Sequence, residues 1–359
     1  MLPLPDTTTA TRRNIVRKYK LSEFPDPRPF LHIRCGDDIL DTLVEAGIPG
    51  DGIRWADVLC EGPLHLHADE EHRRKERAAY IATRYQIPLA ETYREILGAD
   101  WRVDQCVRYD ETVLWFEADL FDQAILVYLL ARLARFAGEA KISLICIGSF
   151  PGVRRFIGLG QLGPAQLATL LPTRRPVTAK QFELARVAWE AFNAPDPRAL
   201  IRLAGSRSRV LPYLPAAIRR YLAEYPSTRN GLSLTEQRAL EAFAAGAATP
   251  VEAFFRVQRR ESRPYLGDWM FYAMIRGLAA GDQPALEGEH PRLARLRVPE
   301  IRRCRVRLTD TGRRLLAGQA DWCRIAGTGR WMGGVHLRGP EPRWRWDPAR
   351  GRLVERRRK

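Results

Sequence analysis

The sequence predicts an α/β domain with a mainly parallel sheet and flanking helices, followed by a mostly helical and strongly basic domain. Two observations carry this prediction. In the first half, short and nearly continuous apolar runs alternate with segments of helical period, which is typical of a parallel sheet covered on both faces. In the second half helical periodicity dominates, and the positive charge of the chain is concentrated there.

Four apolar runs are the expected strands of the sheet. They are FLHIRC (30–35), IRWADVLC (53–60), TVLWFEAD (112–119) and ISLICIG (142–148). Segments of helical period follow the first three of these runs, and Asp37 or Asp38 is placed to cap the first helix. Alternating strands and helices of this kind indicate strand–helix–strand units.

The chain is longer than one hydrophobic core usually organises, so we expect more than one domain. Its 359 residues divide into a flexible arm (1–28), the α/β domain (29–170), a helical connector (171–228) and a basic domain (229–359). No apolar stretch is long enough to span a membrane, and no apolar segment follows the basic N-terminus as in a secretory signal. We therefore predict a cytoplasmic protein without a membrane partner. The six cysteines form no CxxC pair and are expected to be free thiols, mostly buried.

The basic domain opens with clear helix signals. Ser233 and Glu236 form a capping box, and Gly246 stands where that helix should end. Thr249 and Pro250 begin a second helix. The segment 267–279 supplies a third helix, and the run 304–318 supplies a strand and a final helix opened by Leu-Thr-x-x-Gly. This order looks like a winged helix of bacterial regulators, a fold that also serves as a protein-interaction module.

Several segments together carry a resemblance to a known family. They are LHIRCGDD (31–38), EGP (61–63), LWFEADLFDQ (114–123), the strand before Gly148, and in the tail LTDTGRRLLAG (308–318), RWMGGVHL (330–337) and WRWD (344–347). The first group resembles the bacterial family known as domain of unknown function 1835, and the tail resembles the region that often accompanies it. The resemblance implies a shared fold and a shared pocket, and no particular reaction or cofactor.

Polar side chains follow the expected strands at the edge where ligands bind in parallel sheets. The candidate catalytic residues are Asp37, Glu117 and Asp119, and the candidate ligand-binding residues are Arg34, Gly36, Asp38, Glu61, Asp122, Gln123 and Ser149. Close carboxylates of this kind can hold a hard divalent cation, or one of them can serve as a general acid or base. The alternative is that the aspartates only cap helices.

Other chemistries have weaker signals. The loop after the first strand lacks GxGxxG, and Gly-Ser-Phe-Pro-Gly at 148–152 is not a G-x-S-x-G elbow, so neither a dinucleotide site nor a serine nucleophile is indicated. His65, His67 and His72 lack a spacing that compels a metal site. We assign no metal and no cofactor to the sequence. A small-molecule or nucleotide ligand at this edge of the sheet remains an open alternative.

The charge is divided unevenly along the chain. Residues 1–150 carry 19 Lys and Arg against 24 Asp and Glu, whereas residues 151–359 carry 39 against 18. Such asymmetry favours an acidic partner, most simply double-stranded DNA. The candidate contacts are Arg256, Arg259, Arg260, Arg313, Arg314 and Arg330. Since 52 of the 58 basic residues are Arg, a GC-rich coding sequence is an alternative source of the charge.

Tryptophans interleave with arginines near the C-terminus. Trp322, Trp331, Trp344 and Trp346 could stack on bases, or they could form an aromatic hairpin that turns at Gly333-Gly334 and packs on the domain. The sequence thus leaves three functions open. These are a nucleic-acid-associated or regulatory protein with a ligand pocket in the α/β domain, a metal-assisted hydrolase or nucleotide-processing enzyme, and a protein-interaction scaffold.

Overall fold

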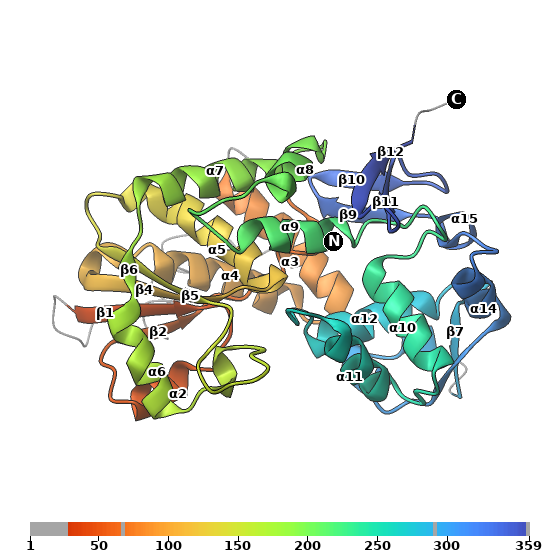
Figure 1. Ribbon diagram of the computed structural model, residues 1–359, viewed down its shortest axis with the longest axis horizontal. Helices are drawn as coiled ribbons and strands as arrows, with labels where there is room; N and C mark the ends of the chain where they lie inside the picture. The colour runs from red at the N-terminus through yellow and green to blue at the C-terminus, as the bar shows by residue number, and fades with distance from the viewer. Residues whose placement is uncertain (1–27, 66–68, 290–292, 357–359) are drawn as a thin grey trace.

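The computed structural model describes residues 28–65, 69–289 and 293–356. Figure 1 shows an α/β part built on one central sheet and, beside it, a second part of helices and small sheets. The expected flexible arm lies outside the described residues except for Arg28, and so does His67. No described helix is long and apolar enough to cross a membrane.

The central sheet confirms the predicted α/β domain with a mostly parallel sheet. Its strands are β1 (Arg28–Arg34), β2 (Asp51–Arg54), β4 (Tyr109–Glu117), β5 (Ile142–Ile147) and β6 (Arg175–Pro176). They lie in the order β2-β1-β4-β5-β6. All neighbouring pairs are parallel except β5 and β6, which are antiparallel. The sheet therefore includes two residues beyond position 170, from the expected connector.

Both faces of the sheet are covered, as the nearly continuous apolar runs predict. Along β4, Leu114 and Phe116 join the larger hydrophobic cluster, whereas Val113 and Trp115 join the smaller one on the opposite face. This alternation follows from the two-residue period of a strand. Figure 1 shows α2 and α6 on one side of the sheet and α3, α4, α5 and α7 on the other. The helices of this part are α2 (Leu40–Glu45), α3 (Glu70–Tyr85), α4 (Leu89–Val103), α5 (Leu120–Leu133), α6 (Pro164–Leu170), α7 (Ala179–Asn193), α8 (Arg198–Gly205) and α9 (Leu214–Leu222).

Helix α5 is the core helix of the α/β part. Nearly all its residues are buried, which explains its long apolar run. Asp119 caps it by accepting a hydrogen bond from the Asp122 backbone N–H at 3.1 Å. The other expected cap is wrong: neither Asp37 nor Asp38 caps α2, whose N-cap residue is Ile39 without a side-chain hydrogen bond. Asp38 bonds to Arg34 instead.

The second part contains the four helices that the basic half predicts and two short ones that it does not. The predicted helices are α10 (Leu234–Ala244), α11 (Pro250–Arg260), α12 (Asp268–Leu278) and α14 (Asp310–Ala317), and the additional ones are α13 (Val298–Ile301) and α15 (Trp322–Ala326). The capping box of Ser233 and Glu236 is present, and Thr249 caps α11. Gly246 follows α10 with φ +86°, a left-handed conformation that glycine adopts without strain.

Three small sheets complete the second part. The strands β7 (Leu286–Gly288) and β8 (Val306–Leu308) pair antiparallel, as do β11 (Trp344–Asp347) and β12 (Arg352–Glu355). The third sheet has the order β10-β9-β3, with β3 (Gly62–Pro63), β9 (Gly329–Gly333) and β10 (Val335–Arg338). The expected hairpin turn therefore falls between β9 and β10, at Gly333-Gly334. Since β3 belongs to the α/β part, this sheet joins the two parts of the chain.

The cysteines are free thiols, as expected. Cys35, Cys60, Cys106 and Cys323 are buried, and Cys146 and Cys304 are half-buried.

Candidate functional site

The first candidate site is the edge of the central sheet where β1 and β4 lie side by side. The chain runs from β1 outward to β2 and then back to β4 on the other side of β1, so the strand order reverses here. Ligands of open α/β sheets bind beyond the carboxyl ends of the strands at such a reversal. Arg34 ends β1, and Glu117 ends β4.

Arg34 holds the carboxylates of this edge together. Its buried guanidinium donates to Asp122 Oδ2 at 2.5 Å and to Glu117 Oε1. Its Nε donates to Asp38 Oδ1 at 3.1 Å. One positive charge thus faces several acids, and Asp119 lies beside them as the cap of α5. The edge is a buried cluster with more carboxyl groups than cations.

Burial and crowding change the protonation of this cluster. Burial, and then repulsion from Asp122, raise the pKa of Glu117 to about 8. Burial likewise raises the pKa of Asp119 well above its ordinary value, with Asp122 and Glu117 adding to the shift. Carboxyls that cannot all ionise next to one another retain protons near neutral pH.

The cluster has ligand atoms for a cation but little free space. Glu117, Asp119 and Asp122 each offer an oxygen, and these oxygens lie within 4.8 Å of one another. Backbone of the segment after β5 closes over them, because the Leu159 N–H donates to Glu117 Oε1 at 2.6 Å. The cavity beside Glu117 and Asp119 has a volume of about 20 Å³. That is room for about one water molecule, not for an organic ligand.

The structure brings together six of the residues that the sequence places at this edge. They are Arg34, Asp38, Glu117, Asp119, Asp122 and Gln123. Gln123 donates to the Glu117 carbonyl oxygen at 2.6 Å. Gly36 lies in the loop above, where a Cβ would meet the Asp38 carboxylate at 3.2 Å. Asp37 and Ser149 are exposed.

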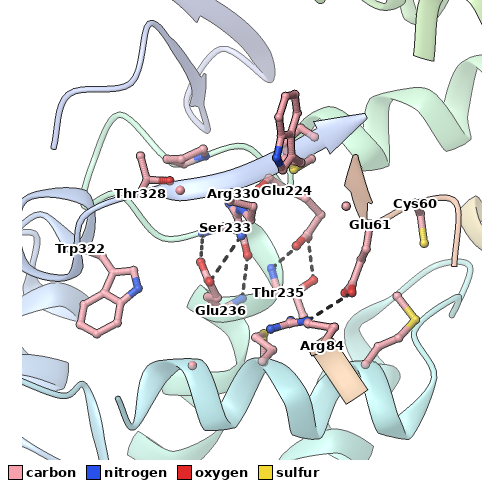
Figure 2. A pocket seen from close by; sticks show the side chains of 18 of the residues that line it. Cys60, Glu61, Arg84, Glu224, Ser233, Thr235, Glu236, Trp322, Thr328 and Arg330 are labelled. Carbon is pink, nitrogen blue, oxygen red and sulfur yellow. Dashed lines mark hydrogen bonds and ion pairs between the residues drawn. The ribbon is translucent and has the colours of Figure 1, made fainter. Parts of the chain in front are cut away.

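The second candidate site is a cavity of about 520 Å³ at the junction of the two parts. Side chains from α3, α10, α12 and β9 line it, together with the loop before β3 (Figure 2). Pockets that bind small molecules have volumes of this order and often lie between domains. The sequence places Glu61 and Arg330 among its candidate residues, and both line this cavity.

Strand pairing brings the two walls of the cavity together. Gly62 of β3 is the register partner of Met332 in β9, and Pro63 is the partner of Gly333. Glu61 and Arg330, which flank these pairs, therefore face one space although they are far apart in the sequence. Gly62 must be glycine: its φ is +78°, and a Cβ would overlap the Tyr80 ring.

Arg77 fixes the loop that carries Glu61. Its side chain is fully buried and donates to Asp57 Oδ1 at 2.6 Å. It also donates to the carbonyl oxygens of Val58, Glu61 and Pro63 at 3.0, 2.8 and 3.1 Å. A planar guanidinium with several donors can satisfy all these acceptors at once. The loop is thereby held in the shape that presents Glu61 to the cavity.

Glu61 is held by donors from α3. Its Oε2 accepts from Tyr85 Oη at 3.0 Å and from Tyr80 Oη at 3.4 Å. Arg84 Nε lies 3.6 Å from the same oxygen, which is an ion pair without a hydrogen bond. Burial raises the pKa of both tyrosines, with Glu61 adding to the shift, so both remain donors at neutral pH.

On the opposite wall, Arg330 faces the start of α10. It donates to the Glu224 carbonyl oxygen at 2.6 Å and lies 3.5 Å from Glu236 Oε1. The Glu224 carboxylate accepts from Arg220 at 2.5 Å and from the Thr235 hydroxyl at 2.6 Å. Both signs of charge thus line the cavity, and most of the acids have partners outside it.

The remaining wall is apolar and adaptable. Met270, Met274 and Met332 line the cavity, and they are three of the four methionines of the chain. Unbranched thioether side chains adjust to the shape of a bound molecule. Trp322 and Trp331 add flat aromatic surface. Such a wall suits an organic ligand with an apolar or aromatic body.

Sequence reasoning missed most of this cavity. The residues it missed include Arg84, Tyr80, Glu224, Glu236 and the methionines. The family resemblance could have pointed to this cavity, because its EGP and RWMGG segments form the paired strands. Periodicity could not supply it, since β3 has only two residues.

The arginines expected to contact nucleic acid have different surroundings. Arg256 donates to the Ala245 carbonyl oxygen at 2.5 Å, Arg260 pairs with Glu241, and Arg330 lies in the cavity. Arg259 and Arg314 are exposed. Arg313 is also exposed, although it donates to the Leu308 carbonyl oxygen and lies 3.8 Å from Asp310.

A denser set of exposed arginines lies along the chain before, within and after β8. It consists of Arg295, Arg297, Arg302, Arg303, Arg305, Arg307, Arg313 and Arg314. Glu287 pairs with Arg307 at 3.0 Å, while Glu289 lies 3.8 Å from Arg305. We call this set the β8 arginine surface. It is separate in sequence from the arginines of α11.

Two histidines contact the Trp331 ring beside the cavity. Trp331 stacks on His336 with ring centroids 4.0 Å apart and meets His65 edge-on at 4.6 Å. His65 also contacts Glu76 at 2.7 Å.

The chain matches no protein-family model and no curated protein. Of the two candidate sites, the cluster at the sheet edge is filled by Arg34, and the junction cavity has room for a ligand.

Proposed function

We propose that this protein binds a small organic molecule in the junction cavity. The observation that carries the proposal is a cavity of about 520 Å³ lined by side chains of both parts of the chain. Binding pockets of about 300–1,000 Å³ enclose ligands of nucleoside or drug size. An apolar wall with a few fixed polar groups is the usual composition of such a pocket.

The polar groups of the cavity are held in place before any ligand arrives. Tyr80 and Tyr85 fix the Glu61 carboxylate, and Arg77 fixes the loop beneath it. Groups held in advance lose little conformational entropy on binding. This arrangement supports a binding or reaction site rather than an accidental gap between domains.

The resemblance to domain of unknown function 1835 supports the same proposal. Its segments EGP (61–63) and RWMGGVHL (330–337) pair with each other as β3 and β9 and line the cavity. We propose that the chain belongs to that family and that the pocket shared by its members is this one.

A screen by thermal shift tests the proposal. Gly277 is exposed and lines the cavity from α12, and a Cβ at this position would meet no atom within 4 Å, so a larger side chain can be placed at the edge of the cavity without overlap. Compounds that raise the melting temperature of the wild type should have no effect on Gly277→Phe and should still stabilise Gly277→Ala. Equal stabilisation of the wild type and Gly277→Phe by every compound would place their binding elsewhere.

A second proposal is contact with nucleic acid through the β8 arginine surface. Three helices, α10, α11 and α12, precede the antiparallel pair β7 and β8, and this order supports a winged-helix fold for the domain. The exposed arginines around β8 supply donors for phosphate groups. A labelled DNA duplex should bind with an affinity that falls steeply with salt. Absence of binding at low salt would indicate that the arginines come from a GC-rich coding sequence and do not serve a nucleic-acid partner.

A third proposal, metal-assisted hydrolysis or nucleotide processing, is favoured by one observation. The oxygens of Glu117, Asp119 and Asp122 lie close enough to share a cation. Calorimetric titration with Mn²⁺ should then show one site in the wild type and none in Asp122→Asn. Heat that is unchanged in the variant would contradict a metal at this cluster.

A further inference from the structure

Two arginines reach the junction cavity from different parts of the chain. Arg84 comes from α3 of the α/β part, and Arg330 comes from β9 of the second part (Figure 2). Both line the cavity and are about one third exposed within it.

Arg84 has an unused donor. Its Nη1 donates to the Ala273 carbonyl oxygen at 3.3 Å. Its Nε is buried and has no hydrogen-bond partner among the described residues, and the nearest carboxylate oxygen, on Glu61, is 3.6 Å away. A buried donor without an acceptor is unfavourable, so the Arg84 guanidinium would gain from turning toward an acceptor that a ligand supplies.

The hydrogen-bond donors of Arg330 are also only partly used. Its Nη2 makes a short hydrogen bond to the Glu224 carbonyl oxygen, but its Nη1 lies 3.5 Å from Glu236 Oε1. That separation is at the limit of a hydrogen bond. Both arginines therefore make their ion pairs at long distance.

The acids of the cavity rely on other donors. Glu61 accepts from Tyr80 and Tyr85, and Glu236 accepts from the Ser233 backbone N–H at 2.7 Å. These acids remain held when an arginine turns toward a ligand. Glu224, as described above, has Arg220 and Thr235 as partners.

The positive charges of the cavity also repel one another. The pKa of Arg330 lies above its ordinary value: burial lowers it, Glu236 and Glu224 raise it, and the charge of Arg84 opposes that rise without reversing it. Behind Arg84, Arg276 donates to the Arg84 carbonyl oxygen at 2.7 Å. Burial and then Arg84 lower the pKa of Arg276. An anion between Arg84 and Arg330 would relieve this repulsion.

We infer that the ligand of the junction cavity is an organic anion, whose carboxylate or phosphate group is bound by Arg84 and Arg330 together. This inference rests on the proposed function. Guanidinium groups form charge-assisted and often paired hydrogen bonds with both kinds of oxyanion. The apolar body of the ligand lies against the methionines and Trp331, which favours an aromatic or heterocyclic acid or a mononucleotide.

Two dyes that share a ring system test the inference on the full-length protein. Anilinonaphthalene sulfonate is an aromatic anion, and phenylnaphthylamine is the same ring system without the sulfonate. Fluorescence titrations compare the wild type with Arg84→Gln, Arg330→Gln and Gly277→Phe. Arg186→Gln, on the exposed face of α7, is the matched control for loss of one positive charge.

The anionic dye should bind the wild type at a site that Gly277→Phe removes. Each of Arg84→Gln and Arg330→Gln should weaken it about tenfold or more while leaving phenylnaphthylamine within about twofold, because charge-assisted hydrogen bonds are lost only for the anion. Arg186→Gln should change neither dye. Displacement by inorganic phosphate or by benzoate then distinguishes a phosphate ligand from a carboxylate.

Other outcomes distinguish the anion inference from the pocket proposal. If both dyes bind the cavity and the arginine variants affect them equally or not at all, the anion inference is wrong and the pocket proposal survives. If neither dye binds, or Gly277→Phe changes neither, the inference and the pocket proposal both fail. Far-ultraviolet circular dichroism of each variant shows that the fold is intact.

Discussion

Gly62 and Met332 are register partners in a parallel pair of strands that joins the two parts of the molecule. The pair is short, yet it places the loop carrying Glu61 opposite the strand carrying Arg330. Two buried interactions support it, one on each side. Arg77 holds the loop from the α/β part, and Gly334 packs against α7 from the second part.

The first prediction concerns Arg77. Arg77→Ala leaves Asp57 buried without its cation and removes donors from three carbonyl oxygens. We expect the free energy of unfolding to fall by about 3–5 kcal/mol, the usual result of breaking a buried pair. Urea denaturation measures it. Arg94→Ala, on the exposed face of α4, should change stability by no more than about 0.5 kcal/mol; equal effects of the two variants would contradict this role.

The second prediction concerns the fit of the turn between β9 and β10. A Cβ on Gly334 would overlap the Asn193 carbonyl group, whereas a Cβ on Gly329 would meet no atom within 4 Å. Gly334→Ala should therefore destabilise the protein by more than about 1 kcal/mol, because the backbone of α7 must move. Gly329→Ala should be close to neutral. Thermal unfolding of the pair compares them, and a neutral Gly334→Ala would mean that the turn and α7 are not in contact.

The third prediction concerns pH. Glu117 has a pKa of about 8 in the folded protein, well above the value of about 4.3 in an unfolded chain. Between these values the folded protein holds a proton that the unfolded chain has lost, so stability is fully present at low pH and falls as pH rises through about 8. Glu117→Gln should make the stability fall less steeply with pH. The difference should be at most about 1.4 kcal/mol for each pH unit between the two pKa values.

Asp119 shifts in the same direction and needs its own control. Asp119→Asn keeps an oxygen that caps α5, so it isolates the loss of the titrating group from the loss of the cap. Urea denaturation between pH 5 and about 8.5 is the measurement. Stability that rises with pH in the wild type over this interval would show that the carboxyls of the cluster are all ionised.

The fourth prediction concerns the β8 arginine surface. Replacing Arg302 and Arg303 with Ala should weaken binding of a DNA duplex. The slope of log affinity against log salt should fall by about 0.9 for each phosphate that no longer has an arginine partner. The matched control is Arg256→Ala with Arg260→Ala, because both side chains already have protein partners. Fluorescence anisotropy over a salt series measures both. A larger decrease in the control would move the interface to α11.

Much of the central sheet could be predicted from the sequence, because its strands are apolar runs buried on both faces. Hydrophobicity predicted a strand at 112–119 followed by a helix, and the structure has the strand at 109–117 and the helix after it. The second strand was expected to continue to residue 60, but it ends at Arg54. Beyond that point Asp57 turns toward Arg77, and no local pattern reports such a partner.

The candidate sites were predictable to different degrees. Polar residues at strand ends indicated the cluster of Arg34, Glu117 and Asp122, since parallel strands end at one edge. That Arg34 fills this crevice is a matter of side-chain packing, which the sequence does not show. The junction cavity depends on pairing between distant segments, and Arg84 enters it from a helix whose pattern is that of an ordinary amphipathic helix.

A crystal structure of the protein with the compound that raises its melting temperature most is the decisive measurement for the junction cavity. We expect electron density for that compound against Met270 and Met274, with an anionic group within hydrogen-bonding distance of Arg84 and Arg330. Density at the cluster around Arg34 or on the β8 arginine surface, with the cavity containing only solvent, would contradict both the pocket proposal and the anion inference.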